Sequence, residues 1–262
     1  MLDFIFYYSQ LGLALAKLLG VRFVPGKGLE GVIGRMLAQV IVYHNAKNYE
    51  FRDRELTKLS LLASELKDIE TYSPELLAHF RNMYRLKRAD YYGFRVEVAT
   101  ASFFIRRNVD FIKNESPDYV VNRPSGKQVF VECGSAHLDK PKNRSIGYKI
   151  SSAVAGKIKL PYLNVSTALF VDITNVIHHT LVSGNYLDQS DIESIVKAEM
   201  SGKQIGATCL FFYMLDKDKD YFNHNSIRID NEGIDPILLE FLDDQFPDDG
   251  DAISNYTIPH TG

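Results

Sequence analysis

Three acidic residues lie at positions where a small protein core would normally avoid charge. Glu97 has apolar neighbours at helical spacing, Asp118 follows a proline at the start of an apolar run, and Glu132 lies inside the run Val-Phe-Val-Glu-Cys. Carboxylates that reach a common point suit Mg²⁺, which binds a few carboxylates together with waters and phosphate oxygens. Such a cation can polarise a phosphodiester and activate water. The acids therefore indicate metal-assisted phosphodiester hydrolysis as a candidate chemistry.

The spacing of two of these acids predicts that they meet on a β-hairpin. Residues 122–126 read Asn-Arg-Pro-Ser-Gly, which is typical of a turn between antiparallel strands. Side chains alternate between the two faces of a strand, so Glu132 shares a face with Gly134. Asp118 begins the neighbouring strand. We therefore expect Asp118 and Glu132 to come within reach of one divalent cation, supported by Glu97 from the preceding helix.

The pattern from Tyr91 to Leu215 alternates between helical and strand segments. Helices are expected at 93–107, 145–158 and 191–200, and strands at 109–112, 118–121, 128–135, 167–173 and 207–215. This order predicts an α/β (α+β) fold with a mixed central sheet flanked by helices.

These acids and this order of elements resemble the PD-(D/E)XK nuclease superfamily over roughly Tyr91 to Leu215. The resemblance implies a restriction-endonuclease-like core in which Asp118 and Glu132 bind Mg²⁺ (or Mn²⁺). Glu97 corresponds to the acid of the first core helix. The implied activity is that of a metal-dependent nuclease, a hydrolase whose first candidate substrate is DNA. The resemblance also permits a homodimer.

One position departs from the superfamily pattern. A lysine is expected two residues after the second acid, where it would hold the attacking water and offset developing charge, and here that residue is Gly134. Lys149 and Lys157 on the following helix could supply the amine instead. Lys149 is favoured because the start of that helix should lie near the site, although Lys157 lies closer to the middle of the apolar face.

Two rival interpretations remain open from the sequence. In the first, the protein is catalytically degenerate and binds nucleic acid or a protein partner without cleavage. In the second, it is an α/β interaction protein in which three acids coincide by chance. Other chemistries lack support, because the sequence has no C-x-x-C pair, no glycine-rich phosphate loop and no recognisable nucleophile triad. His137 is expected at the surface, and Asp172 is expected to have a structural role.

Basic residues flank the acids, although the formal net charge of the chain is −3. One group between 140 and 159 comprises Lys140, Lys142, Arg144, Lys149, Lys157 and Lys159. The other comprises Arg81, Arg85, Lys87, Arg88, Arg95, Arg106 and Arg107, with tyrosines interleaved. Such groups suit a polyanionic partner such as DNA. They are also found on ordinary solvated helix faces.

The segments around the expected core are predicted to support it. Residues 1–88 should form a helical N-terminal subdomain, residues 89–215 the nuclease-like core, and residues 216–262 an acidic C-terminal extension. The first twenty residues are apolar, but Asp3 and Lys17 interrupt them. This favours a helix packed on the protein over a membrane-associated segment.

The number and positions of the cysteines indicate the redox compartment of the protein. The chain has two cysteines, Cys133 and Cys209, and both lie in apolar strand-like runs. Two cysteines cannot build a disulfide framework, so buried free thiols in a reducing compartment are expected, which favours a cytoplasmic protein.

Overall fold

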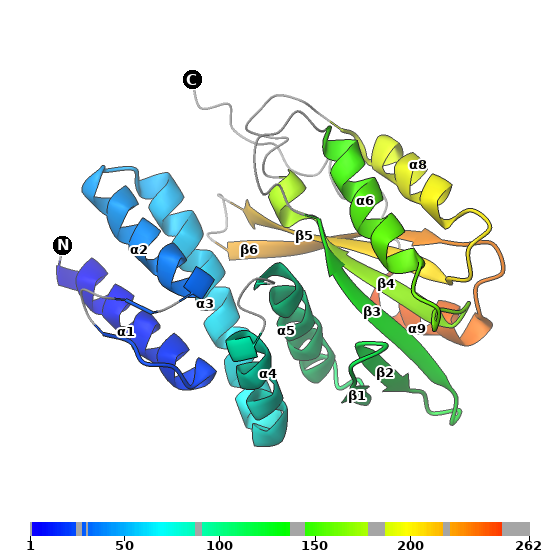
Figure 1. The fold of residues 1–262 in the computed structure, drawn as a ribbon, viewed down its shortest axis with the longest axis horizontal. Helices are drawn as coiled ribbons and strands as arrows, with labels where there is room; N and C mark the ends of the chain where they lie inside the picture. Colours follow the sequence, from blue (N-terminus) through cyan, green and yellow to red (C-terminus); the bar gives the residue numbers. More distant parts are fainter. Residues whose placement is uncertain are drawn as a thin grey trace. The chain divides into compact units, whose positions relative to one another are not determined.

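The chain forms two compact units, Met1–Asn108 and Val109–Gly262, each with its own buried core. A computed structural model of the protein, drawn in Figure 1, describes residues 2–24, 28–29, 31–86, 91–136, 145–177, 187–216 and 221–247. No helix in these ranges is long and apolar enough to cross a membrane.

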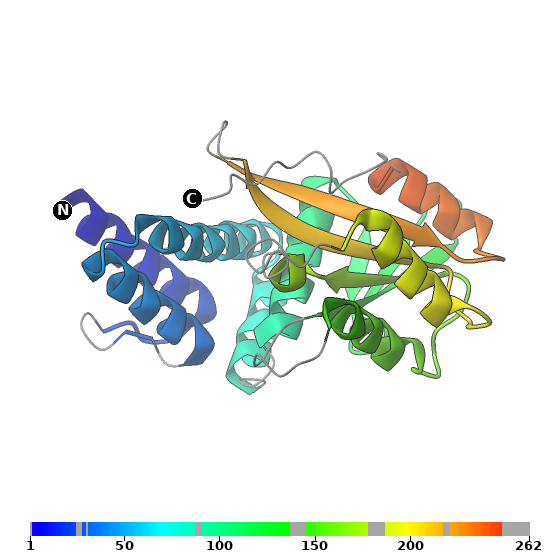
Figure 2. The ribbon, with the colours of Figure 1, turned by 90° about the horizontal axis from the view of Figure 1, so that it is seen from above.

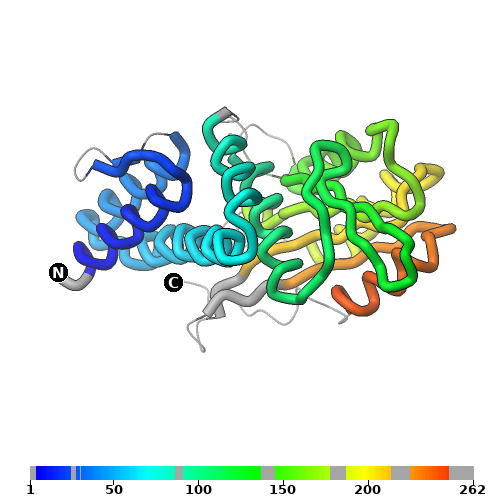
Figure 3. Tube along the Cα trace, turned by 90° about the horizontal axis from the view of Figure 1, so that it is seen from below, coloured from blue at the N-terminus to red at the C-terminus, as the bar shows by residue number. Residues whose placement is uncertain are grey.

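The N-terminal unit is helical, as the sequence predicted for most of its length. Its helices are α1 (Leu2–Leu19), α2 (Gly31–Asn45), α3 (Tyr49–Tyr72), α4 (Pro74–Leu86) and α5 (Tyr91–Arg106), and Figure 3 traces the chain through them. Leucine and isoleucine stripes at helical spacing bury Leu15, Leu37 and Leu59 completely. The Ser73 hydroxyl accepts a hydrogen bond from the Leu76 amide at 3.1 Å, so it caps α4.

The boundary between the units differs from the one expected at residue 88. Helix α5 packs against α3 and α4 and therefore belongs to the N-terminal unit. A buried ion pair explains part of this packing, because Arg95 on α5 lies 2.6 Å from the Glu65 carboxylate on α3. Periodicity alone identified the helix but could not show which elements its apolar face would contact.

The C-terminal unit contains a six-stranded mixed sheet in the order β1-β2-β3-β4-β5-β6. The strands are β1 (Phe111–Lys113), β2 (Tyr119–Asn122), β3 (Gln128–Ser135), β4 (Thr167–Asp172), β5 (Ala207–Asp216) and β6 (Tyr221–Asp230). Strands β1, β2 and β3 pair antiparallel, β3, β4 and β5 pair parallel, and β6 returns antiparallel to β5. The expected mixed sheet flanked by helices is therefore confirmed.

Helices cover both faces of this sheet. Helices α6 (Ile146–Ile158) and α8 (Gln189–Met200) cover one face, and α9 (Pro236–Gln245) covers the other (Figures 1 and 2). The alternation of side chains along β4 explains the two layers. Leu169 and Val171 join the core beneath α6 and α8, whereas the Phe170 ring packs against Phe246, which follows α9, with ring centroids 5.0 Å apart.

Part of the segment expected to be an acidic extension belongs to this unit. Strand β6 pairs with β5, and α9 packs on β3. Strand β6 is an edge strand with a largely polar sequence, and its Ile227 and Ile229 side chains are buried. The acidic run of this segment comprises Asp243, Asp244, Asp248, Asp249 and Asp251. Asp243 pairs with Arg228 and Asp244 pairs with Arg123. The other three acids lie outside the described residues.

Both cysteines are free and buried, as the sequence predicted. Burial raises the pKa of the Cys209 thiol to about 12, although the nearby Arg228 guanidinium opposes this shift. Neither thiol is therefore placed as a reactive group at the surface.

Candidate active site

Two of the three acids lie side by side on the β2–β3 hairpin. Tyr119 pairs with Val131 in the antiparallel register, so Asp118, one residue before, lies opposite Glu132. Residues opposite each other in such a pair project to the same face. Both are buried, Asp118 being 7% exposed and Glu132 3% exposed. The hairpin thus places two carboxylates together in a poorly solvated position.

The Asp118 carboxylate is oriented by the backbone of the neighbouring strand. The Cys133 amide donates a hydrogen bond to Asp118 Oδ2 at 2.7 Å. The other oxygen, Oδ1, accepts from the Lys113 amine at 3.3 Å. Lys113 lies on β1, its side chain is 6% exposed, and its amine also donates to the Asn114 carbonyl at 2.6 Å.

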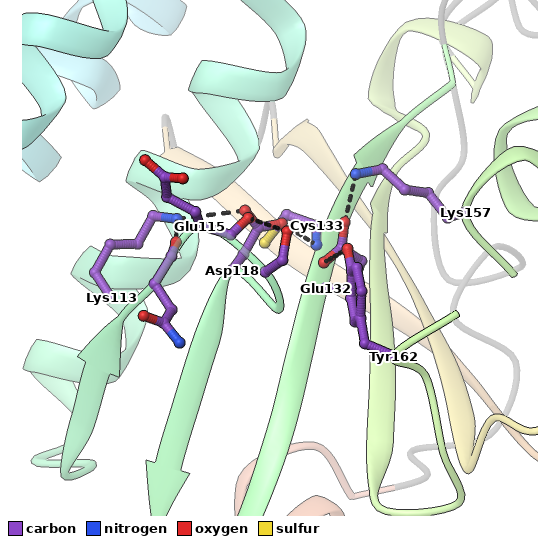
Figure 4. A network of polar contacts seen from close by, with 9 residues as sticks. Lys113, Glu115, Asp118, Glu132, Cys133, Lys157 and Tyr162 are labelled. Atoms are coloured by element: carbon purple, nitrogen blue, oxygen red, sulfur yellow. Dashed lines mark hydrogen bonds and ion pairs between the residues drawn. The ribbon is translucent and has the colours of Figure 1, made fainter. Parts of the chain in front are cut away.

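The Glu132 carboxylate is held by two side chains from the far end of the β3–β4 connection. The Lys157 amine donates to Glu132 Oε1 at 2.6 Å, and the Tyr162 hydroxyl donates to Oε2 at 3.0 Å. Lys157 lies in the last turn of α6 and Tyr162 in the loop that follows. Figure 4 shows Lys157 and Tyr162 converging on Glu132 while Asp118 and Lys113 lie on the other side of Cys133.

Lys157 occupies the space above Gly134. A Cβ atom at position 134 would lie 3.5 Å from Cγ and 3.7 Å from Cε of Lys157. Gly134 and Glu132 share a face of β3, so the lysine of α6 reaches the volume that a side chain at 134 would enter. An amine carried by α6 thus lies beside Glu132, next to a position of β3 that has no side chain of its own.

Opposing effects act on the pKa of Lys157. Burial disfavours the charged amine and lowers its pKa, but the hydrogen bond to Glu132 and the charges of Glu132 and Asp118 outweigh this, so the pKa lies above its ordinary value. Lys157 is therefore an ammonium group at neutral pH. The effect of Asp118 on this amine supports the view that both acids and the lysine form one electrostatic cluster.

The donor set fits a hard divalent cation. Each carboxylate oxygen has two lone pairs, and each described hydrogen bond uses one of them, so every oxygen of Asp118 and Glu132 can still accept a metal bond. Within the described ranges, no group of three or more His, Cys, Asp and Glu side chains is placed to hold a metal. Two carboxylates with water and phosphate oxygens are the usual environment of Mg²⁺.

The other predicted residues have separate outcomes. Glu97 is buried on α5 in the N-terminal unit, so its role stays a prediction. Lys149 lies about two helical turns before Lys157 on α6, whose end, rather than its start, lies over Gly134. Asp172 accepts a hydrogen bond from the Thr174 amide at 2.8 Å and so has the structural role that was expected. His137 lies outside the described residues.

Sequence reasoning missed two members of the cluster. Lys113 precedes the Pro117-Asp118 motif by only a few residues and directly follows the strand expected at 109–112, which was an available signal. Tyr162 follows α6 in a loop, where no periodicity or motif marks it. Its contact with Glu132 depends on how the β3–β4 connection folds back.

Several arginines of the basic group between Arg81 and Arg107 have partners inside the protein. Arg81 donates to the Leu18 carbonyl at 2.8 Å and to the Lys17 carbonyl at 3.1 Å, and Arg85 donates to the Gly20 carbonyl. These contacts satisfy carbonyl groups at the end of α1. Arg95 and Arg106 pair with Glu65 and Asp68, respectively. Lys87, Arg88, Lys140, Lys142 and Arg144 lie outside the described residues.

Comparisons with known proteins identified no relative. No family model matches the chain, no curated protein matches it, and no solved structure matches it.

Proposed function

We propose that this protein is a metal-dependent nuclease with a restriction-endonuclease-like core that hydrolyses phosphodiester bonds, with DNA as its first candidate substrate. The observation that carries the proposal is the ion pair of Lys157 with Glu132 above Gly134, beside the Asp118 carboxylate. This arrangement combines two buried acids with an amine where the nuclease resemblance requires one. It removes the main objection to activity, which was the glycine at position 134.

Each residue of the cluster would have a distinct chemical role. Asp118 and Glu132 would hold Mg²⁺, which when bound supplies Lewis-acid polarisation of a phosphoryl oxygen and lowers the pKa of a water molecule. The Cys133 amide keeps the Asp118 carboxylate oriented. The Lys157 ammonium would hold the attacking water and offset the negative charge that develops on the phosphate. Its raised pKa keeps it charged for this role.

Cleavage assays with matched variants test the proposal. The wild-type protein should nick supercoiled DNA or cut linear DNA with Mg²⁺ or Mn²⁺ and stop when EDTA is added. Glu132→Gln and Asp118→Asn should each abolish cleavage, whereas Glu232→Gln, at an exposed acid, should retain it. The same assays on single-stranded DNA and RNA define the substrate. Absence of cleavage of all these substrates with both metals would contradict the proposal.

A second function is favoured by one observation at the same site. Each acid already has a lysine counter-ion, Lys113 for Asp118 and Lys157 for Glu132, so the cluster is charge-balanced without a metal. A nuclease-fold protein that binds nucleic acid or a protein partner without cleavage could keep such a cluster. Binding of DNA or RNA in a mobility-shift assay, unchanged by Glu132→Gln and without cleavage under any metal, would select this alternative.

A further inference from the structure

Tyr162 contacts one acid of the candidate site directly. Its hydroxyl donates a hydrogen bond to Glu132 Oε2 at 3.0 Å. The loop after α6 thus supplies a second donor to the carboxylate that Lys157 already contacts.

The contact of Tyr162 with Glu132 restricts rotation of the carboxylate about its terminal torsion. The terminal torsion of a glutamate is broad, so a single hydrogen bond from Lys157 to Oε1 leaves the carboxylate free to turn about that contact. The second bond, from Tyr162 to Oε2, fixes both oxygens. Because Glu132 is only 3% exposed, solvent has little access to replace a lost donor. A buried acceptor that loses its partner is costly, and the carboxylate would reorient instead.

We propose that Tyr162 is a positioning residue that sets the orientation of the Glu132 carboxylate for binding a divalent cation. This inference rests on the proposed function, because it concerns the same two acids. It goes further by assigning metal affinity to a residue in the α6–β4 loop that touches neither the metal nor the substrate. Mg²⁺ requires nearly ideal octahedral geometry, so a small rotation of one ligand weakens its binding.

The phenol is suited to this role in its neutral form. A phenol with the ordinary tyrosine pKa of about 10 keeps its proton at neutral pH, so Tyr162 remains a hydrogen-bond donor to the carboxylate. Removing only the hydroxyl, as in Tyr162→Phe, tests this donation while the ring is kept.

Calorimetric titration of Mg²⁺ into the full chain provides the test. Loss of a hydrogen-bond partner of a metal-binding carboxylate typically costs about 10- to 100-fold in metal affinity, and we expect a loss in this range for Tyr162→Phe. The matched control Tyr72→Phe, at a tyrosine that is 52% exposed, should keep the wild-type affinity. The Glu132→Gln variant should show no Mg²⁺ binding at this site.

Thermal unfolding separates positioning from a merely structural role. In EDTA, Tyr162→Phe should unfold at the wild-type midpoint, whereas the rise in midpoint on adding Mg²⁺ should be smaller than in the wild type, because ligand binding stabilises only the folded state. If Tyr162→Phe lowers the midpoint in EDTA, the titration is repeated at a temperature at which that variant is fully folded. Mg²⁺ binding that stays weaker there supports the proposal, and wild-type affinity overturns it.

The outcomes distinguish the two proposals. If the wild type binds Mg²⁺, Glu132→Gln does not, and a normally folded Tyr162→Phe binds it as tightly as the wild type, the positioning role is overturned and the nuclease proposal stands. If the wild type binds no Mg²⁺ or Mn²⁺, or Glu132→Gln binds as the wild type does, the metal site itself is overturned, and this inference fails with it.

Discussion

At the scale of single residues, the candidate site consists of a few charged groups that share a buried space. Asp118 and Glu132 are nearly inaccessible to solvent, and each has an ammonium partner. Buried charges are tolerated only when they are paired and hydrogen-bonded, so the lysines explain how the acids can be present without a cation. A cation at the site would share these carboxylate oxygens with the two lysines.

The identity of the catalytic amine is testable at this scale. Lys157→Ala should lower cleavage by about 10²- to 10³-fold, the typical cost of losing one group that stabilises developing charge. Lys149→Ala should have a much smaller effect, and Lys197→Ala, at an exposed lysine on α8, should have none. The rate of DNA nicking at saturating Mg²⁺ should be measured for each of the three variants.

A compensating change sharpens this test. A side chain at position 134 would enter the volume that Lys157 fills, so Gly134→Lys in the Lys157→Ala background should restore part of the lost activity. The same substitution in the wild type should not increase activity, because the space is already occupied. A larger loss from Lys149→Ala than from Lys157→Ala would instead return the role to the lysine that the sequence favoured.

At the scale of elements, pairs of charged residues connect helices and strands that are distant in the sequence. Arg123 of the β2–β3 turn pairs with Glu240 and Asp244 on α9, and Arg228 of β6 pairs with Asp243. In the N-terminal unit, Glu65 and Arg95 join α3 to α5. The sequence predicted the individual elements well, because periodicity and turn residues are local signals. These cross-connections were not predictable, because they depend on packing.

The Glu65–Arg95 pair makes a prediction about stability. Burial raises the pKa of Glu65, and Arg95 opposes this shift by its charge and hydrogen bonding. Arg95→Met would leave a buried carboxylate without its partner, and we expect it to lower the free energy of unfolding by about 3–5 kcal/mol at neutral pH. The double variant Glu65→Leu/Arg95→Met should be far less destabilised. Urea unfolding of both variants measures this difference.

The pH dependence of that loss has a definite sign. A carboxyl group with a raised pKa in the folded state favours folding most at low pH, and this contribution is lost as the pH rises through the folded pKa. Without Arg95 the pKa of Glu65 should rise further. The deficit of Arg95→Met should therefore shrink as the pH falls from 7 toward the ordinary glutamate value of 4.5. A deficit that stays constant over this range would show that packing, rather than the buried charge, causes it.

At the scale of the whole molecule, the formal net charge of −3 gives no strong field for a polyanion, so phosphate binding would depend on where the cations lie. Part of the basic group between Arg81 and Arg107 already stabilises the N-terminal unit. Arg81 and Arg85 donate to carbonyl groups at the end of α1. A guanidinium that caps a helix is less available to a phosphate than its sequence position suggests.

These contacts predict that Arg81 contributes to stability rather than to DNA affinity. Arg81→Ala should lower the free energy of unfolding by about 1 kcal/mol, from lost hydrogen bonds and a lost favourable charge at a helix C-terminus. It should leave DNA affinity unchanged, as should the control Lys67→Ala, at a lysine whose side chain is 63% exposed. Urea unfolding and mobility-shift titrations provide the measurements. A loss of DNA affinity without a loss of stability would show that Arg81 faces the partner.

The sequence by itself determined the local parts of this protein. Alternation along β3 placed Glu132 and Gly134 on one face, turn residues predicted the β2–β3 hairpin, and the order of helices and strands predicted a mixed sheet flanked by helices. These features follow from interactions between residues close in the chain.

Only the tertiary structure decided which distant groups surround the acids. Lys157 and Tyr162 reach Glu132 because the end of α6 and the loop after it return to β3. Helix α5 belongs to the N-terminal unit because its buried face meets α3. Such contacts depend on the packing of whole elements, and residue spacing along the chain carries little information about that packing.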